Sequence, residues 1–220
     1  MSDWILFGGR FDPVHRGHLA VADWWYRHRP SFRKFLFVPS GTPPHRDPTA
    51  LTPAHHRFAM LVLALQDRPW AMVWDDELTR AAPAYTVETL RRFHQTWGTQ
   101  PDQVVFVMGA DAYLTFHTWY EFPRHLDLCT ICVFHRPPVS VEQVRAYHAT
   151  YLPSAPLYVG HPEPWPSPPA VVFIPDLSVD VQAIEVRDAC RQGQAFAHWV
   201  VPSVAAYIQR YRLYALKPPG

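Results

Sequence analysis

The chain has 220 residues, of which 48% are hydrophobic, and its formal net charge is +1. This length and composition predict one globular domain over residues 1–220, with enough chain to bury a sizeable core. A charge near zero argues against nucleic acid or a membrane as a partner, so an anion site needs cations placed locally. No apolar run reaches membrane-spanning length and no secretion leader is evident. Three cysteines in such a chain favour reduced thiols and a cytoplasmic location.

The most informative stretch runs from Gly8 to His18. The apolar run 4–7 before it predicts a buried strand, and the unbroken segment 19–27 after it predicts a helix. A glycine-rich turn between the two directs backbone N–H groups at the positive end of a helix, where phosphate binds. His15 and His18 are three residues apart and are expected to face the same side, where imidazole donates to phosphate whether neutral or charged. A turn with two exposed histidines is the alternative.

Further strands are predicted at 35–38, 71–74, 104–108, 130–134 and 170–174, with helices at 53–64, 87–93 and 141–151. Thr52 is expected to cap the first of these helices with Pro53 as its first residue, and Thr86 is expected to cap the second. Cys129 and Cys132 lie in the run 128–134, which reads as a strand, and they are expected to point to opposite faces, which argues against a metal or redox pair. The proline-rich segment 161–169 predicts an extended surface loop.

Gly8 to His18 resembles the G-G-[ST]-F-D-P-x-H-x-G-H signature of the nucleotidyltransferase superfamily. Within it, the chain is most similar to the bacterial nicotinate mononucleotide adenylyltransferase family, from residue 4 to about residue 214. One departure is that Arg10 stands where the family has Ser or Thr. The resemblance implies a Rossmann-like doubly wound parallel α/β sheet in a single domain. It also implies transfer of the adenylyl group of ATP to nicotinate mononucleotide, giving deamido-NAD and pyrophosphate in NAD biosynthesis.

The resemblance assigns roles to individual residues. The ATP-binding set is Gly8, Gly9, Phe11, His15, Gly17, His18, Gln182 and Arg187, of which His15, His18 and Arg187 would be catalytic. The set that binds the acceptor nucleotide is Arg10, His45, Arg46, Thr86, Gly109, Asp111, Trp119 and Tyr120. Trp119 would stack on the pyridine ring, and Asp111 would accept from a ribose hydroxyl, cap the next helix or help to position Mg²⁺. That Mg²⁺ would arrive with ATP, and no dedicated metal site is expected. For Arg136, a structural role and a place near the ligand both stay open, as does the oligomeric state.

The segment 181–187 departs most from the family, which has I-S-S-T-x-[IV]-R at this helix start. Gln182, Ala183 and Ile184 replace the two serines and the threonine, while Arg187 is retained. A charge-assisted hydrogen bond contributes roughly 1.5–3 kcal/mol, so the loss of hydroxyl contacts slows transfer unless Gln182, Arg10 or backbone N–H groups compensate. Two alternatives therefore accompany the adenylyltransferase hypothesis. One is an enzyme for a different small phosphorylated acceptor, and the other is a nucleotide-binding homologue with reduced or lost catalysis.

Overall fold

The computed structural model describes residues 3–41, 51–80, 84–178 and 180–215. Its centre is a parallel sheet of seven strands in the order β3-β2-β1-β4-β5-β7-β6. The strands are β1 (Trp4–Gly9), β2 (Lys34–Pro39), β3 (Ala71–Val73), β4 (Val104–Gly109), β5 (Thr130–Phe134), β6 (Leu157–Val159) and β7 (Val171–Ile174). The predicted α/β fold with a doubly wound parallel sheet is confirmed.

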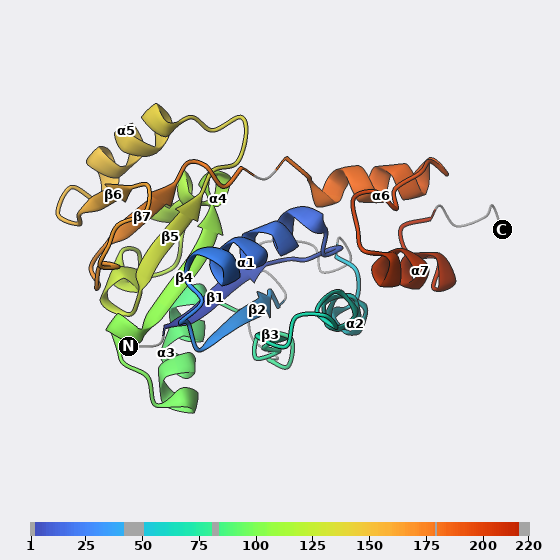
Figure 1. Ribbon diagram of the computed structural model, residues 1–220, viewed down its shortest axis with the longest axis horizontal. Helices are drawn as coiled ribbons and strands as arrows, with labels where there is room; N and C mark the ends of the chain where they lie inside the picture. Colours follow the sequence, from blue (N-terminus) through green and yellow to red (C-terminus); the bar gives the residue numbers. More distant parts are fainter. Residues whose placement is uncertain (1–2, 42–50, 81–83, 179, 216–220) are drawn as a thin grey trace.

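Seven α-helices of the described residues connect and extend these strands (Figure 1). They are α1 (Arg16–His28), α2 (Ala54–Ala64), α3 (Thr86–Trp97), α4 (Ala110–Tyr113), α5 (Val141–Tyr151), α6 (Ala183–Arg191) and α7 (Pro202–Arg210). Short 3-10 turns occupy Pro101–Gln103, Phe116–Thr118 and Arg124–Asp127. Figure 1 shows α6 and α7 together at one end of the molecule, and α7 packs against α2 there. None of the helices in the described ranges is long and apolar enough to cross a membrane.

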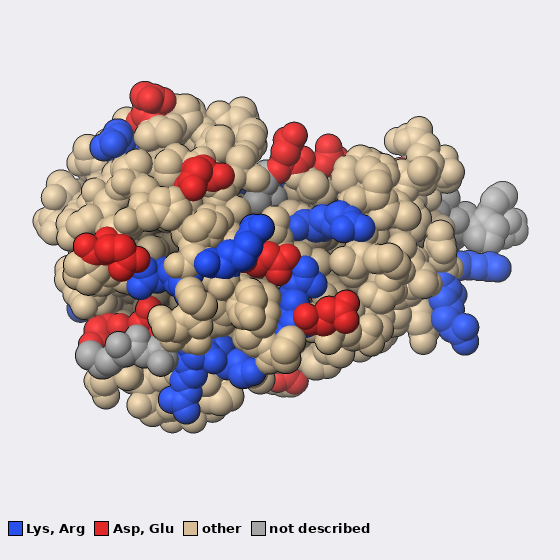
Figure 2. Space-filling view, viewed as in Figure 1, with Lys and Arg blue, Asp and Glu red and all other residues tan. Residues whose placement is uncertain are grey.

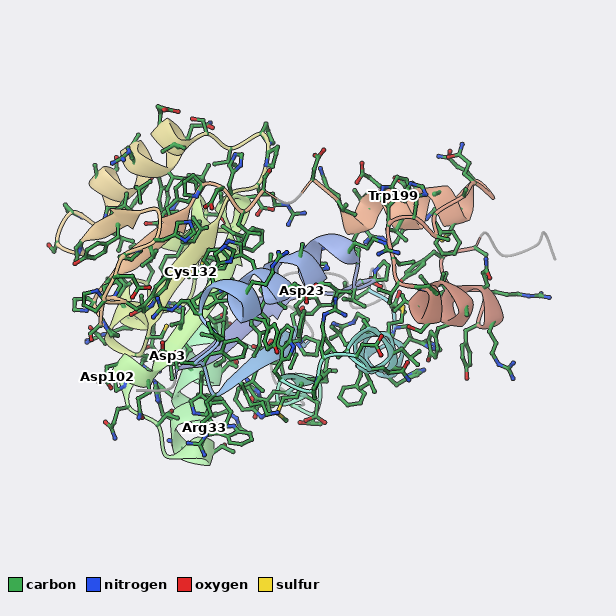
Figure 3. The ribbon with its side chains drawn as sticks, viewed as in Figure 1. Asp3, Asp23, Arg33, Asp102, Cys132 and Trp199 are labelled. Atoms are coloured by element: carbon green, nitrogen blue, oxygen red, sulfur yellow. The ribbon has the colours of Figure 1, made fainter. Side chains whose placement is uncertain are left out.

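Alternate residues of each central strand enter two separate cores, because side chains along a strand point to opposite faces. Ile5 and Phe7 of β1 face the core that also holds buried residues of α1, α2, α6 and α7. Trp4 and Leu6 face the other core, to which α3 and α5 contribute. Cys129 belongs to the second core and Cys132, labelled in Figure 3, to the first. Both thiols are buried, and the prediction that they face opposite sides of the sheet is confirmed.

The winding of the sheet reverses between β1 and β4. From β1 the chain proceeds outward to β2 and β3, whereas β4 pairs with β1 on its other side and leads to β5. In open α/β sheets, the crevice at the carboxyl ends of the strands flanking such a reversal is where ligands bind. Here those strand ends carry Gly8 and Gly9 on β1 and Gly109 on β4.

Some local predictions are wrong. Pro53, not Thr52, is the N-cap of α2, because the backbone N–H of Thr52 donates to Asp12 Oδ2 and its carbonyl accepts from Arg57 Nε. Thr86 is the first residue of α3 and Tyr85 is its N-cap. The edge strand β6 was not predicted, since its three residues form no distinctive apolar run. The loop over 161–169 is confirmed as irregular.

Candidate active site at the start of helix α1

His15 and His18 join the turn after β1 to the start of α1. His15 is the N-cap of the helix, and its ring stacks on that of His18 with centroids 3.6 Å apart. The backbone N–H of each residue donates to the Nδ1 of the other, at 3.2 Å to His18 Nδ1 and 3.4 Å to His15 Nδ1. The prediction that the two imidazoles face the same side is confirmed. Because both Nδ1 atoms accept, we assign the Nε2–H tautomer to both rings.

The environment keeps both imidazoles neutral. Burial, followed by the positive charge of Arg136, lowers the pKa of His15 to about 3. Burial, then the charges of His15 and Arg136, lowers the pKa of His18 well below its ordinary value. His15 is only 2% exposed, and its Nε2 has no hydrogen-bond partner among the described residues. A buried donor of this kind is uncommon unless a ligand completes it.

The turn that presents these histidines is tightly constrained. Phe11 is buried although its φ is +49°, in the left-handed region that non-glycine residues rarely adopt. A Cβ on Gly8 would lie 2.8 Å from the ring of Phe106, and a Cβ on Gly9 would lie 3.0 Å from the ring of Phe11. Glycine at both positions therefore allows these two aromatic rings to pack directly on the strand end. Gly17, inside the first turn of α1, is buried.

Arg187 comes to the same place from the other end of the chain. Its Nη1 donates to the carbonyl of Asp12 at 2.6 Å, three residues before His15. The chain beyond α6 also contacts the start of α1, since the carbonyl of Trp199 (labelled in Figure 3) accepts from the backbone N–H of Arg16 at 2.8 Å. The structure thus brings together the three residues predicted to be catalytic, His15, His18 and Arg187. Arg10, in the same turn, is exposed.

At the tip of β4, Gly109 is followed by the short helix α4. A Cβ on Gly109 would lie 2.6 Å from Asp111 Oδ1 and 3.4 Å from Cδ of Arg136. Arg136 Nη1 lies 3.5 Å from Asp111 Oδ2. The side chain of Asp111 is half exposed, so the premise that a buried carboxylate demands a ligand does not apply to it. Gly109, not Asp111, is the N-cap of α4. The positive charge of Arg136 lowers the pKa values of both histidines.

Trp119 and Tyr120 follow α4, and they point to different neighbours. The ring of Trp119 packs edge-on against Phe116, with centroids 5.2 Å apart, and also against Phe106. Tyr120 is 48% exposed, and its ring lies 4.4 Å from that of Tyr85, next to Thr86 at the start of α3. Tyr120 therefore contacts the N-cap of α3, the residue that precedes the predicted acceptor residue Thr86. His45 and Arg46 lie outside the described residues.

A buried polar network connects the end of β2 to the first turns of α3. Glu77, 8% exposed, accepts from the hydroxyl of Thr89 at 2.7 Å and from the backbone N–H of Gly41 at 3.3 Å. Burial raises the pKa of the Glu77 carboxyl, an effect that these two hydrogen bonds oppose. A Cβ at Gly41 would lie 2.4 Å from the Glu77 carbonyl oxygen, so only glycine permits this approach. The network holds the end of β2 against the first turns of α3.

The start of α6 differs from the expectation for Gln182. Gln182 was predicted to bind ATP. In the structure it is the N-cap of α6, and its backbone N–H donates to Glu185 Oε2 at 2.8 Å. Gln182 and Ile184 are exposed, and Ala183 is half-buried. A carboxylate therefore satisfies one N–H at the helix end that the family is expected to offer to phosphate.

Sequence reasoning missed Asp12, Arg57, Glu77 and Tyr214. Asp12 lies within the motif, yet it was assigned no role, and the other three act through contacts between residues far apart in the chain. No group of three or more His, Cys, Asp or Glu side chains within the described ranges is placed to hold a metal ion. On the face shown in Figure 2, basic and acidic side chains are interspersed, in keeping with the near-neutral charge.

Comparisons with solved structures give the same fold. A Plasmodium falciparum nicotinic acid mononucleotide adenylyltransferase complexed with APC aligns with a TM-score of 0.73 and 16% identity, over 97% of this chain and 98% of that one. The same enzyme complexed with NaAD aligns with a TM-score of 0.72 and 15% identity, over the same shares of the two chains. At these identities the likeness establishes the fold alone.

Sequence comparisons give the family. A "Probable nicotinate-nucleotide adenylyltransferase" of Thermus thermophilus is 32% identical over 209 residues, covering 95% of this chain and 97% of the relative. A protein with the same name from Thermomicrobium roseum is 31% identical over 214 residues, covering 97% of this chain and 92% of the relative. The cytidylyltransferase-like family model matches residues 6–184. The chain belongs to the cytidylyltransferase-like family.

Proposed function

We propose that this protein transfers the adenylyl group of ATP to nicotinate mononucleotide, forming deamido-NAD and releasing pyrophosphate. The relatives that cover nearly all of the chain carry this activity in their names. One structural observation supports it most strongly: His15 Nε2–H is a buried donor with no partner among the described residues, at the N-terminus of a 13-residue helix. A phosphate oxygen supplies the missing acceptor, and the helix dipole favours its negative charge.

In this reaction a phosphate oxygen of the mononucleotide attacks the α-phosphorus of ATP. The bond from that phosphorus to the bridging oxygen breaks, and pyrophosphate leaves with the electron pair. The attacking oxygen is already an anion, so no general base or covalent intermediate is needed, and positioning and charge stabilisation supply the rate. Mg²⁺ enters as part of the ATP complex and offsets charge on the phosphates.

We assign the ATP phosphates to His15, His18 and Arg187, on the carboxyl side of β1. Both imidazoles are neutral Nε2–H donors, so the positive charge in this region comes from arginines. Arg187 lies against Asp12, and Arg136 raises the potential at both rings from the far side of Gly109. A guanidinium stays charged at every working pH and donates in a fork that matches phosphate.

We assign the acceptor nucleotide to the neighbouring crevice beside β4. The ring of Tyr120 lies against that of Tyr85, the residue before Thr86 at the start of α3, and Asp111 presents a half-exposed carboxylate that can accept from a ribose hydroxyl. Arg10 is exposed in the same turn as the histidines and is the cation we assign to the acceptor phosphate, together with the predicted residues His45 and Arg46. Trp119 reaches the pyridine ring only with the part of its surface not packed on Phe116.

A coupled pyrophosphate assay tests the proposal. Purified protein is given Mg–ATP with nicotinate mononucleotide, with nicotinamide mononucleotide or with no acceptor. We expect pyrophosphate and deamido-NAD in equal amounts with the nicotinate compound, and slower turnover with the amide. If ATP binds by calorimetry but neither nicotinate mononucleotide nor nicotinamide mononucleotide gives turnover, the proposal is overturned in favour of a nucleotide-binding protein without this catalysis.

A further inference from the structure

Tyr214, close to the carboxyl end of the described chain, contacts the catalytic turn directly. Its hydroxyl donates to Asp12 Oδ1 at 2.8 Å, although the two residues are 202 positions apart. The backbone of Tyr214 has φ +64°, and Arg212 before it has φ +49°. L-residues rarely adopt these values, so tertiary contacts must hold this segment in place.

Asp12 connects its own turn, between β1 and α1, to three other segments of the chain. The residue is only 2% exposed, and Oδ2 of its carboxylate accepts from the backbone N–H of Thr52 at 3.2 Å. Its carbonyl accepts from Arg187 at 2.6 Å, and His15 follows three residues later. The same aspartate therefore contacts the segment before α2, helix α6 and the end of the chain.

A buried arginine, Arg57, also connects two of these segments. Arg57 of α2, 3% exposed, donates from Nη1 to the carbonyl of Arg10 at 2.9 Å and from Nε to the carbonyl of Thr52 at 3.0 Å. Its charge also lies near the Asp12 carboxylate. Burial raises the pKa of the Tyr214 hydroxyl, and the charge of Asp12 raises it further, so the phenol remains a donor at every working pH.

We infer that Tyr214 is a positioning residue for ATP. By fixing the Asp12 carboxylate, its hydroxyl sets the orientation of the turn that carries His15 and of the carbonyl that holds Arg187. The two parts of the phosphate site come from opposite ends of the sequence, and Asp12 is the residue through which Tyr214 connects them. This inference rests on the proposed function, because it assigns the ATP phosphates to these residues.

The test is Tyr214→Phe, which removes the hydroxyl and keeps the ring. ATP affinity is measured by titration calorimetry, kcat and KM by the pyrophosphate assay, and stability by urea unfolding. We expect the Kd and the KM for ATP to rise about tenfold, as for loss of one hydrogen bond to a charged group. The KM for nicotinate mononucleotide stays within about twofold. Tyr211→Phe is the matched control, because Tyr211 is 52% exposed on the same segment, and we expect wild-type ATP affinity from it.

A cycle with Asp12→Asn separates positioning from a general loss of stability. The two substitutions act on one contact, so the double variant is expected to bind ATP no more weakly than the worse single variant. Wild-type ATP affinity in folded Tyr214→Phe, or strictly additive losses in the cycle, would overturn the inference. A wild-type protein that binds ATP without turnover would instead overturn the proposed acceptor chemistry, and the calorimetric arm would still decide the role of Tyr214.

Discussion

His15 and His18 stabilise each other's position as much as they prepare a site. Their rings stack at 3.6 Å, and each Nδ1 accepts the other residue's backbone N–H, closing the first turn of α1. The same contacts use Nδ1 of both rings and leave Nε2–H as the remaining donor, and that of His15 has no partner among the described residues. The helix cap and the ligand site are therefore one arrangement, and a change to either histidine affects both.

The low pKa of His15 makes stability depend on pH in a definite direction. An imidazole of the unfolded chain titrates near 6.5, whereas burial and then Arg136 lower the folded pKa to about 3. Between these values the unfolded chain binds more protons, so stability is complete above pH 6.5 and is lost as the pH falls toward 3. This group contributes a slope of up to about 1.4 kcal/mol per pH unit.

His15→Asn keeps a helix-capping side chain and removes the titrating group. We expect urea unfolding between pH 7.5 and 5 to show a shallower loss of stability in this variant than in wild type. His125→Asn is the control, because His125 is a buried histidine whose pKa is lowered to about 4 outside the proposed phosphate site. Both variants flatten the slope, but only His15→Asn weakens ATP binding. Identical slopes for wild type and His15→Asn would contradict the neutral assignment.

The helix start at 182–184 predicts a slow enzyme. Replacing Gln182 and Ala183 by Ser and Ile184 by Thr restores three hydroxyl donors where the exposed native side chains offer fewer. We expect kcat/KM for ATP to rise at least about tenfold, the value of one charge-assisted hydrogen bond. Gln182→Asn is the control, since asparagine caps the helix without a hydroxyl. An unchanged kcat/KM in the triple variant would mean that backbone N–H groups already bind the phosphates.

The sheet and the motif could be predicted because their signals are local. Apolar runs such as 104–108 mark buried strands, and the spacing of His15 and His18 alone places their rings together. The predicted helix caps at Thr52 and Thr86 are wrong. At Thr52, contacts with distant residues override the local preference for a capping hydroxyl. Thr52, for example, donates to Asp12, 40 positions away.

The rest of the site depends on contacts between residues far apart in the sequence, which the spacing of residues in a motif does not predict. Tyr214 contacts Asp12 across 202 positions of the sequence, and Glu77 contacts Gly41 across 36. Asp111 was predicted from its place at a strand tip, but the chain turns into α4 there and exposes the carboxylate beside Arg136. Long-range hydrogen bonds of this kind require the fold itself, whereas the motif requires only the local sequence.

Glu77 makes stability depend on pH in the direction opposite to His15. Burial is the largest effect on its carboxyl and raises the folded pKa above 4.5. The folded state therefore binds the proton more tightly, and the stabilisation is complete below pH 4.5 and is lost as the pH rises through the folded pKa. Glu77→Gln removes this dependence, so the stability cost of the substitution shrinks as the pH rises.

Glu142→Gln provides a control of opposite sign. Hydrogen bonds to its own backbone N–H and to Ser140 lower the pKa of Glu142, an exposed residue in the first turn of α5. The cost of that substitution grows as the pH rises toward 4.5. Urea unfolding of both variants and wild type from pH 3 to 7 checks the pair, and a cost of Glu77→Gln that grows with pH would contradict the raised pKa of the buried carboxyl.

The most direct test of phosphate binding at the start of α1 is calorimetric ATP affinity in the His15→Asn/His18→Ala double variant. Two charge-assisted hydrogen bonds are lost, so we expect the Kd for ATP to rise at least about 100-fold, with pyrophosphate release falling with it. His161→Ala is the control, an exposed histidine paired with Asp176. Wild-type affinity and turnover in a folded double variant would contradict the claim that the start of α1 binds the ATP phosphates.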